Sequence, residues 1–410
     1  MKNKNEAYID VAALSNNYKE IKKICRGGNV ICVVKADAYG HGAAEVSRLL
    51  GEAGCGFFAV SSEAEAVEIR KCEEKHGRYP EILILGHIMP ENVPEMIKLG
   101  VTCAAVSAEN AAALSEAASA CGGRLKVHVK IDTGMNRLGF SAGDERYAET
   151  VGQIEKISRD RNLDMCGIFT HFACADGDLS PGAANGNARG MTAVQLSRFE
   201  RILSRLAEMG VDPGLRHAAN SAASLWLPEA CFDAVRAGII LYGYMPDGSI
   251  DSRFKPVMKF YSTIAHMHTV KKGESVGYGS AFAAKRDSVI ATAAAGYADG
   301  VRRDLSSAGC AVETGGMRFP VVGNVCMDQL MFDVTDAEQL PAIGDRVTFF
   351  GGDDGSLMLD TASRLSTIPY ELLCSVSKRV PRIYVTEDAG DGGDGGDGSF
   401  LKERTKELSD

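Results

Sequence analysis

A lysine near the N-terminus follows an apolar segment and precedes a turn that contains two glycines. The segment Val-Val-Lys-Ala-Asp-Ala-Tyr-Gly-His-Gly occupies residues 33–42, and Lys35 comes directly after the apolar run Val30–Val34. A lysine in a buried position is costly unless its charge is paired or its amine does chemistry. Desolvation lowers the pKa of an amine, which suits a lysine that holds a carbonyl cofactor as a Schiff base. For one lysine taken alone, a side chain that extends into solvent is the simpler alternative.

Further polar groups follow other apolar segments of the first 245 residues. They are Lys130, Arg137, His171, Ser221 and Arg236, with the backbone of Gly238 and Ile239. Small hydroxyl and backbone N–H donors, such as those of Ser221 and Gly238, are typical of phosphate sites. The guanidinium groups of Arg137 and Arg236 add planar, positively charged hydrogen-bond donors. An amine, a phosphate anchor and two guanidinium groups together fit pyridoxal phosphate, an aldehyde cofactor that carries a phosphate.

These residues come at the carboxyl ends of eight predicted strands, with helix-like stretches between them. The strands are Val30–Val34, Phe57–Val60, Ile82–Leu85, Thr102–Val106, Lys126–Ile131, Cys166–His171, Leu215–Ala219 and Ala234–Ile240. Apolar runs without alternation indicate a parallel sheet that is buried on both faces. Eight such units predict a (β/α)₈ barrel, in which the carboxyl ends of the strands meet at one mouth. A doubly wound sheet is the alternative, but its Gly-x-Gly-x-x-Gly turn is missing here.

The pattern of apolar residues changes after about residue 245, where helical periodicity is replaced by short strand-like segments. We expect an α/β protein with an N-terminal TIM-like barrel and a C-terminal mostly-β domain. The stretch 388–398 consists only of Asp, Gly and Ala, which predicts a flexible linker, and the Gly- and Ala-rich stretch 180–190 is interpreted as an insertion. The predicted units are an N-terminal segment, 1–11, associated with the β domain, the barrel, 12–245, the β domain, 246–385, and an Asp/Gly tail, 386–410.

Composition narrows the class of protein. The chain has 410 residues, is 45% hydrophobic and 24% charged, and carries a net charge of −9. Such a charge argues against nucleic acid or an anionic membrane as a partner. No run is long enough to span a bilayer, and residues 1–6 lack a signal-peptide core. The twelve cysteines contain no Cys-x-x-Cys pair, so we expect reduced thiols, no metal site and a cytoplasmic protein.

The motifs resemble those of alanine racemase, a barrel-fold pyridoxal-phosphate amino-acid racemase, from about residue 7 to residue 385. Any one motif is weak, and their joint order carries the resemblance. Besides residues 33–42, they are Lys-Ile-Asp-Thr-Gly-Met-Asn-Arg-Leu-Gly (130–139), Thr-His-Phe-Ala (170–173), Ala-Asn-Ser (219–221), Arg-Ala-Gly-Ile (236–239), Gly-Tyr-Gly (277–279), Gly-Tyr-Ala-Asp-Gly (296–300), Cys-Met-Asp-Gln (326–329) and Pro-Tyr-Glu (369–371).

The resemblance implies two catalytic bases, one for each face of the substrate. Lys35 would carry the cofactor and act on one face, and Tyr278 from a partner subunit would act on the other. The resemblance assigns the remaining roles as follows: Tyr39, Ser221, Gly238, Ile239 and Tyr370 bind the phosphate; Arg236 faces the pyridine nitrogen; His171 links Arg236 to Tyr278; Arg137 contacts the cofactor's phenolic oxygen and the substrate carboxylate; Met327 binds that carboxylate through its backbone N–H; Tyr297 and Tyr370 narrow the entrance.

Three of these residues keep a structural alternative at this point. Tyr278 could be a core tyrosine beside a turn, and His171 a hydrogen-bonded barrel histidine without a catalytic part. Lys130 is carbamylated in some relatives, where it orients the arginine that corresponds to Arg137. An ordinary buried lysine paired with an acid is the alternative for Lys130.

The resemblance implies interconversion of L-alanine and D-alanine, which supplies D-alanine for peptidoglycan, by a homodimer with shared active sites. A racemase of serine or another amino acid on the same fold is the alternative. Two further hypotheses are a basic amino-acid decarboxylase and a non-enzymatic cofactor-binding protein that consists of a lone barrel. The decarboxylase would need a different cysteine motif in the β domain. The complete β domain with Tyr278 argues against the lone barrel.

Overall fold

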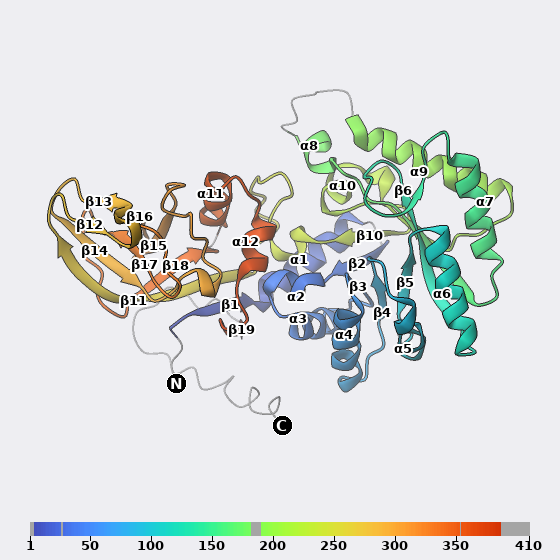
Figure 1. Ribbon diagram of the computed structural model, residues 1–410, viewed down its shortest axis with the longest axis horizontal. Helices are drawn as coiled ribbons and strands as arrows, with labels where there is room; N and C mark the ends of the chain where they lie inside the picture. Colours follow the sequence, from blue (N-terminus) through green and yellow to red (C-terminus); the bar gives the residue numbers. More distant parts are fainter. Residues whose placement is uncertain (1–3, 26–27, 182–189, 353, 387–410) are drawn as a thin grey trace.

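The computed structural model describes residues 4–25, 28–181, 190–352 and 354–386. The chain forms two domains that lie next to each other along the long axis of the molecule (Figure 1). The predicted linker at 388–398 lies outside the described residues, as does most of the predicted insertion at 180–190. The strand β1 (Glu6–Asp10) belongs to the sheet of the second domain, so that domain combines residues from both ends of the described chain, whereas the barrel is one continuous stretch.

The first domain is a nearly closed barrel of eight parallel strands in the order β10-β2-β3-β4-β5-β6-β8-β9. The strands are β2 (Asn29–Val33), β3 (Phe57–Val60), β4 (Glu81–Ile84), β5 (Thr102–Ala105), β6 (Leu125–Asp132), β8 (Leu163–Phe169), β9 (Leu215–His217) and β10 (Ala234–Ala237). A short strand, β7 (Phe140–Ser141), pairs with β6. The Arg236 amide donates to the Ala219 carbonyl at 3.0 Å, which joins the two ends of the sheet. The closed order rules out the doubly wound alternative.

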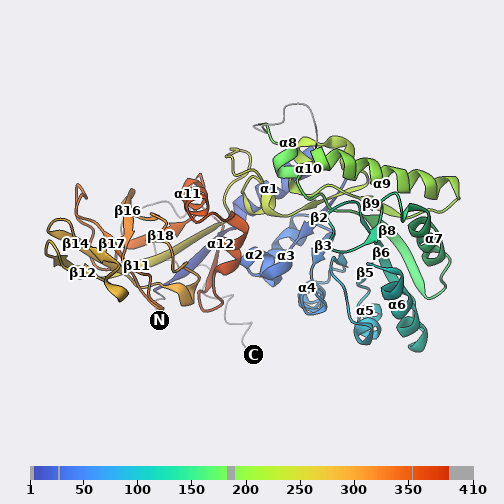
Figure 2. The same cartoon turned by 45° about the horizontal axis from the view of Figure 1, so that its top comes forward.

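Helices cover the outside of this barrel (Figure 2). Ser62 and Ser107 begin two of them, because each side chain accepts a hydrogen bond from a backbone amide three residues later. The helices of this domain are α1 (Val11–Ile24), α2 (Lys35–Gly40), α3 (Ala43–Glu52), α4 (Glu63–Lys75), α5 (Val93–Lys98), α6 (Ala108–Ala120), α7 (Tyr147–Ser158), α8 (Ala175–Leu179), α9 (Gly190–Glu208) and α10 (Ser221–Trp226), with the 3₁₀ turns η1 (Pro90–Asn92), η2 (Pro228–Ala230) and η3 (Ile239–Tyr242).

The second domain is a mostly antiparallel β structure. Its strands are β1 (Glu6–Asp10), β11 (Met258–Val270), β12 (Ser275–Val276), β13 (Phe282–Ala283), β14 (Ser288–Ala293), β15 (Ala311–Thr314), β16 (Met317–Val322), β17 (Leu330–Asp333), β18 (Arg346–Phe350) and β19 (Arg382–Val385). Six of these strands form a closed sheet, because β11 pairs with both β18 and β14. The turn at Gly315-Gly316 joins β15 to β16 as a hairpin. The predicted fold class, a TIM-like barrel with a mostly-β domain, is confirmed.

Two elements of the second half of the chain reach the barrel. The helix α12 (Pro369–Ser375) packs against α2, and β19, which pairs in parallel with β1, also contacts α1. A further helix, α11 (Ser356–Arg364), and the 3₁₀ turns η4 (Tyr278–Ser280) and η5 (Tyr297–Asp299) complete the domain. Neither α11 nor α12 was predicted from sequence, and α12 is short and begins with a proline in an otherwise strand-rich region. The position of α12 brings C-terminal residues to the barrel strands' carboxyl ends.

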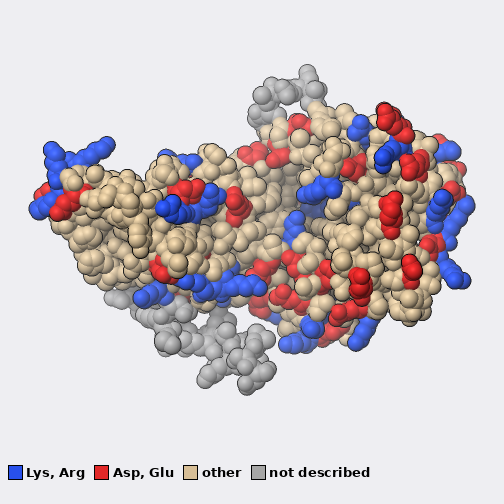
Figure 3. Space-filling model, viewed as in Figure 1, with Lys and Arg blue, Asp and Glu red and all other residues tan. Residues whose placement is uncertain are grey.

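The surface carries no extended field of one sign on the face seen in Figure 3, where Lys and Arg lie among Asp and Glu over both domains. No helix within the described residues is long and apolar enough to cross a membrane. The interior is apolar in both domains, with side chains such as Phe58, Phe199, Phe260 and Phe332 fully buried.

Candidate active site at the barrel mouth

The backbone that follows Lys35 is left-handed. Four consecutive residues that are not glycine, Ala36–Tyr39, have φ between 52° and 55° inside α2. This conformation costs L-residues roughly 1–2 kcal/mol each. The surrounding structure must therefore hold the turn in place. Two carboxylates contribute: Glu65 accepts a hydrogen bond from the Ala36 amide, and Asp37 accepts one from the Ala43 amide.

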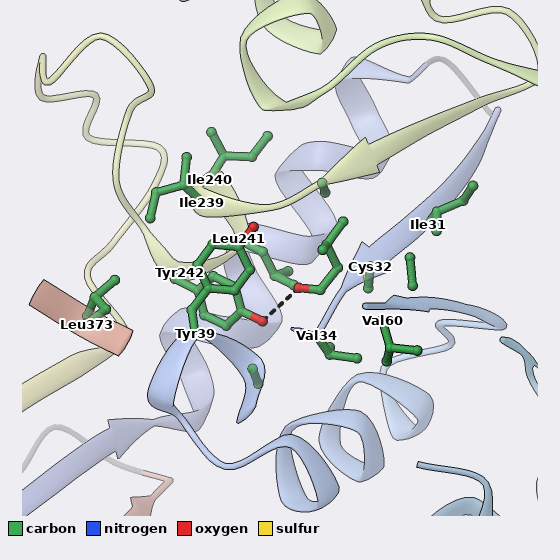
Figure 4. Packing of buried hydrophobic residues seen from close by; sticks show 14 of the residues in the cluster. Ile31, Cys32, Val34, Tyr39, Val60, Ile239, Ile240, Leu241, Tyr242 and Leu373 are labelled. Atoms are coloured by element: carbon green, nitrogen blue, oxygen red, sulfur yellow. Dashed lines mark hydrogen bonds between the residues drawn. The ribbon is translucent and has the colours of Figure 1, made fainter. Parts of the chain in front are cut away.

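The left-handed turn places Tyr39 inside the barrel mouth, the region at the carboxyl ends of the barrel strands. Tyr39 is buried, and its ring lies over that of Tyr242 with centroids 4.7 Å apart (Figure 4). The Tyr242 hydroxyl in turn donates to the Val33 carbonyl at 2.9 Å. Tyr370, from α12, packs on the other side of Tyr39 at 6.0 Å between ring centroids. Burial raises the pKa of Tyr39 and of Tyr370, so both keep their protons and can donate hydrogen bonds.

Three of the predicted phosphate-binding residues meet at one point. The Gly238 amide donates to Ser221 Oγ at 3.0 Å. A Cβ atom on Gly238 would lie 2.8 Å from the Tyr39 hydroxyl oxygen and 3.6 Å from Ser221 Oγ. Ile239 follows at the first residue of η3, and Ser221 is the first residue of α10. Two hydroxyls and the backbone of Gly238 and Ile239 thus surround a space that a single side-chain atom would fill, and we call this group the hydroxyl cluster.

Arg236 is a buried cation held entirely by neutral acceptors. Its Nη2 donates to the carbonyls of Thr170 and Ala218 and lies 3.3 Å from His171 Nδ1, and its Nη1 donates to His217. Burial lowers the pKa of Arg236 to about 9. Within the part of the chain that the structure describes, no ion pair involves Arg236. Its positive charge is therefore not neutralised by a carboxylate and acts on whatever lies beside it.

A chain of two buried histidines extends from Arg236 through the barrel interior. Arg236 Nη1 lies 2.8 Å from His217 Nδ1, and His217 Nε2 lies 2.9 Å from His128 Nδ1. Because an arginine only donates, His217 Nδ1 must accept, and we infer that its proton is on Nε2. His128 then accepts in the same way, so both rings are neutral. Burial and Arg236 lower the pKa of His128 to about 3 and that of His217 well below its usual value.

Two lysines with depressed pKa values face this mouth. Burial and the neighbouring Arg137 lower the pKa of Lys35. Burial and Arg236 lower the pKa of Lys130 to about 7, and the Lys130 amine donates to the Ile131 carbonyl at 3.0 Å. Arg137 itself is exposed at the end of β6. Both amines can therefore lose a proton more readily than an ordinary lysine, which makes them available as bases or nucleophiles.

The remaining predicted residues lie on the β domain of the same chain. Tyr278, Tyr297 and Met327 are 71%, 44% and 54% exposed, respectively. Tyr278 borders a cavity of about 440 Å³ together with His268 and Cys326. The segment with Tyr278, between β12 and β13, is at the end of the molecule away from α2 in both views (Figures 1 and 2). The fold brings the barrel residues and Tyr370 together, but it leaves Tyr278 apart from Lys35 and from His171 within one chain.

Comparisons with known proteins agree with this geometry. The sequence profile of the alanine racemase N-terminal domain matches residues 9–246, and that of the alanine racemase C-terminal domain matches residues 257–384. The chain belongs to the alanine racemase family. Its activity is that of an alanine racemase, an isomerase that acts on a small amino acid.

Curated relatives and solved structures extend along nearly the whole chain. An alanine racemase of Clostridium acetobutylicum is 38% identical over 384 residues, which is 92% of this chain and 95% of that protein. One of Methanococcus maripaludis is 38% identical over 92% of this chain and 98% of its own length. The structure of alanine racemase from Clostridium difficile 630 superposes with a TM-score of 0.83 at 35% identity, covering 94% of this chain and 97% of that chain.

Sequence reasoning gave no role to His217 and His128. His217 was noted at a strand end, and His128 lies two residues before Lys130, so both point to the same side of β6. That spacing was the available signal, since alternate residues of a barrel strand face the interior. What the sequence could not give is that the two rings meet across the barrel. In this alanine racemase His217 binds Arg236, and His128 binds His217.

Replacing His128 with asparagine should reduce the loss of folding stability that occurs as the pH falls. The pKa of His128 is lower in the folded chain than in the unfolded chain, so the unfolded chain takes up the proton first as the pH falls. The folded state thus loses stability below about pH 6.5, by about 2 kcal/mol at about pH 4.5. Asparagine keeps an acceptor for His217 but does not titrate. Denaturant unfolding of both proteins at pH 7 and pH 4.5 measures this difference, and equal losses in the two proteins would contradict it.

Proposed function

We propose that this alanine racemase interconverts L-alanine and D-alanine with pyridoxal phosphate bound at Lys35. The observation that carries the proposal is the convergence of three groups at the barrel mouth. These are the Lys35 amine with its lowered pKa, the hydroxyl cluster around Gly238, and the unneutralised guanidinium of Arg236. An aldehyde that carries a phosphate and a ring nitrogen has one matching partner for each of its polar groups.

The residues present fit this cofactor. Tyr39, Ser221, Gly238, Ile239 and Tyr370 would bind the phosphate, since the Tyr39 and Ser221 hydroxyls meet beside Gly238, Ile239 follows it, and Tyr370 packs against Tyr39. Arg137 would donate to the phenolic oxygen and help to place the substrate carboxylate. When bound, the cofactor supplies a conjugated system that takes up the electron pair left when the α-proton departs.

Arg236 is proposed to determine how strongly the bound cofactor withdraws electrons from the α-carbon of the substrate. A guanidinium group does not give up its proton to a pyridine nitrogen, so the ring nitrogen beside Arg236 would remain unprotonated. The lack of a carboxylate partner among the described residues strengthens this effect, because a carboxylate would offset the charge. A weaker electron sink returns the electron pair to the α-carbon sooner. Prompt return of a proton favours racemisation over elimination or transamination.

Two bases on opposite faces are the economical way to remove one proton and deliver another. We assign Lys35 to one face and Tyr278 of the partner subunit to the other, in a homodimer with shared active sites. Two observations support this arrangement: Tyr278 and Met327 are exposed on the β domain, and Tyr278 is far from Lys35 within one chain. The backbone N–H of Met327 from the partner would bind the substrate carboxylate. His171, already beside Arg236, would connect Arg236 to Tyr278.

Alanine is the proposed substrate, and serine or another amino acid is the alternative. Tyr370 packs beside Tyr39 at the mouth, and Tyr297 is proposed to approach the same entrance from the partner. Two tyrosine rings at an entrance leave room for a small side chain, which favours alanine. We further propose that the protein acts in the cytoplasm and that its product supplies D-alanine for peptidoglycan.

Lys130 is proposed to exist partly as a carbamate that orients Arg137. A neutral amine adds carbon dioxide, and a pKa of about 7 leaves much of Lys130 neutral near pH 7. The anion formed would be stabilised by Arg236 and Arg137, both of which lower the pKa of the uncarbamylated amine. NMR with isotopically labelled bicarbonate should show a carbamate signal that is stronger at about pH 8 than at about pH 6. The signal should disappear in Lys130→Met, and its absence from the unsubstituted protein would refute the carbamate.

A panel of L-amino acids tests the substrate assignment, and Lys35→Ala tests the cofactor assignment. In the panel, we expect racemisation of alanine to be faster than racemisation of serine. We expect Lys35→Ala to lose its racemase activity and also the visible absorption band that borohydride removes. Lys126→Ala is the matched control, because this lysine is on the same strand as Lys130 and pairs with Glu81 at the opposite end of the barrel. Faster turnover of serine than of alanine would support the alternative, and a persistent visible band in Lys35→Ala would exclude Lys35 as the cofactor lysine.

Tyr278→Phe tests the second base. The variant should keep the visible band, because Lys35 and the hydroxyl cluster are unchanged, but should lose exchange of the α-proton from L-alanine in deuterated water. Removal of a general acid–base group lowers the rate by roughly 10²- to 10⁴-fold. Tyr79→Phe, at another highly exposed tyrosine, is the control. A fully active Tyr278→Phe enzyme would contradict the two-base assignment.

A further inference from the structure

Backbone carbonyls at the end of the left-handed turn, and directly after it, are hydrogen-bonded by side chains. His41 Nδ1 lies 2.9 Å from the Ala38 carbonyl and 3.0 Å from the Tyr39 carbonyl, so it bonds to both. The next two carbonyls accept from β19, the last strand of the described chain. Arg382 Nε donates to the Gly40 carbonyl at 2.9 Å, and the Tyr384 hydroxyl donates to the His41 carbonyl at 2.8 Å.

Arg382 also connects this turn to α12. Its two terminal nitrogens donate to the carbonyls of Val376, Ser377 and Val380, at distances between 2.6 and 2.7 Å. Those residues directly follow α12, the helix that carries Tyr370. A single side chain therefore binds both the turn after Lys35 and the segment after Tyr370. All four of these hydrogen bonds go to backbone carbonyls. The ammonium group of a lysine could not replace the planar guanidinium group of Arg382 in this arrangement.

The turn is also in close steric contact with α12 and β19. A Cβ atom on Gly40 would lie 2.3 Å from the Leu373 carbonyl oxygen, and one on Gly42 would lie 2.1 Å from the Tyr384 hydroxyl oxygen. No side chain fits at either position, so Gly40 and Gly42 are needed for the approach as well as for their positive φ. Figure 4 shows Leu373, from α12, on the same side of the cluster as Tyr39.

We propose that Arg382 and Tyr384 are positioning residues for Lys35 and Tyr39. They act through the Gly40 and His41 carbonyls, which directly follow the left-handed residues Ala36–Tyr39: without these two donors, part-buried carbonyls lose their partners and the left-handed backbone loses the restraint at its C-terminal end. The turn then relaxes toward the commoner right-handed conformation, which redirects Tyr39 and Lys35. The C-terminal strand thereby sets the geometry of a site more than 340 residues earlier in the chain. This inference rests on the proposed function for its cofactor readout, but not for its second readout.

Tyr384→Phe and Arg382→Lys test the positioning role, with Tyr147→Phe as the matched control. Tyr147 also donates from its hydroxyl to a backbone carbonyl, that of Arg201 at 3.2 Å, but lies on α7 away from α2. The first readout is the dissociation constant of pyridoxal phosphate, followed by visible absorption. We expect Tyr384→Phe to bind the cofactor about 3- to 10-fold more weakly, as for the loss of one hydrogen bond. Tyr147→Phe should bind it like the unsubstituted protein.

The second readout is the pH dependence of chemical labelling of Lys35 in the cofactor-free protein, followed by peptide mass spectrometry. If the turn relaxes, Lys35 becomes less buried, and the midpoint of labelling rises toward that of an ordinary lysine. We expect this rise in Tyr384→Phe and in Arg382→Lys, and no change in Tyr147→Phe. A general loss of stability would affect all three variants alike and would not single out Lys35.

Unchanged cofactor affinity and an unchanged labelling midpoint in Tyr384→Phe would overturn the positioning role. If Arg382→Lys fails to fold, Tyr384→Phe decides, because it removes a single oxygen atom. If the unsubstituted protein binds no pyridoxal phosphate, the proposed function fails, and the labelling midpoint alone then supports or refutes the positioning role.

Discussion

The left-handed turn directly after Lys35 is the constraint on which the rest of the site depends. Four successive L-residues in this conformation are unfavourable, so the turn exists only because its neighbours hold it. It allows both Lys35 and Tyr39 to lie at the barrel mouth. Glu65 from α4 binds it from one side, and residues of the C-terminal strand bind it from the other. The two domains therefore contribute jointly to a site whose chemistry lies in the barrel.

Electrostatics at the mouth follow from one buried cation. Arg236 has only carbonyls and histidine nitrogens as partners, and its field helps to keep His128, His171 and His217 neutral. The same field lowers the pKa of Lys130. A site with several depressed pKa values and no compensating carboxylate suits an anionic ligand that carries a phosphate. The cost of burying the guanidinium group is offset when such a ligand binds beside it.

Much of the fold follows from the sequence for identifiable reasons. The eight barrel strands were found because parallel strands buried on both faces read as continuous apolar runs, such as Val30–Val34. The residues of the mouth were found because the barrel brings the ends of all strands together. The resemblance to the alanine racemase family, now shown by the comparisons, added the β-domain residues, whose roles had no signal in local pattern.

Other features could not be predicted, because they depend on contacts between distant segments. Ala-Asp-Ala-Tyr has no preference for a left-handed turn, and the turn depends on hydrogen bonds to Glu65 and Asp37 and on the donors from β19 that bind the residues directly after it. Arg382 and Tyr384 sit in an ordinary-looking strand at the end of the chain. The helix α12 was missed for a related reason, since its seven residues contain too little periodicity to stand out.

Borohydride reduction of the purified holoenzyme, followed by peptide mass spectrometry, tests the central claim most directly. The claim is that the amine at the start of the left-handed turn is the one that binds pyridoxal phosphate. The account predicts a pyridoxyl-phosphate mass increase on the peptide that contains Lys35, and on no other lysine peptide. A modified Lys130, the other lysine at the mouth with a depressed pKa, or a modification spread over surface lysines would contradict it.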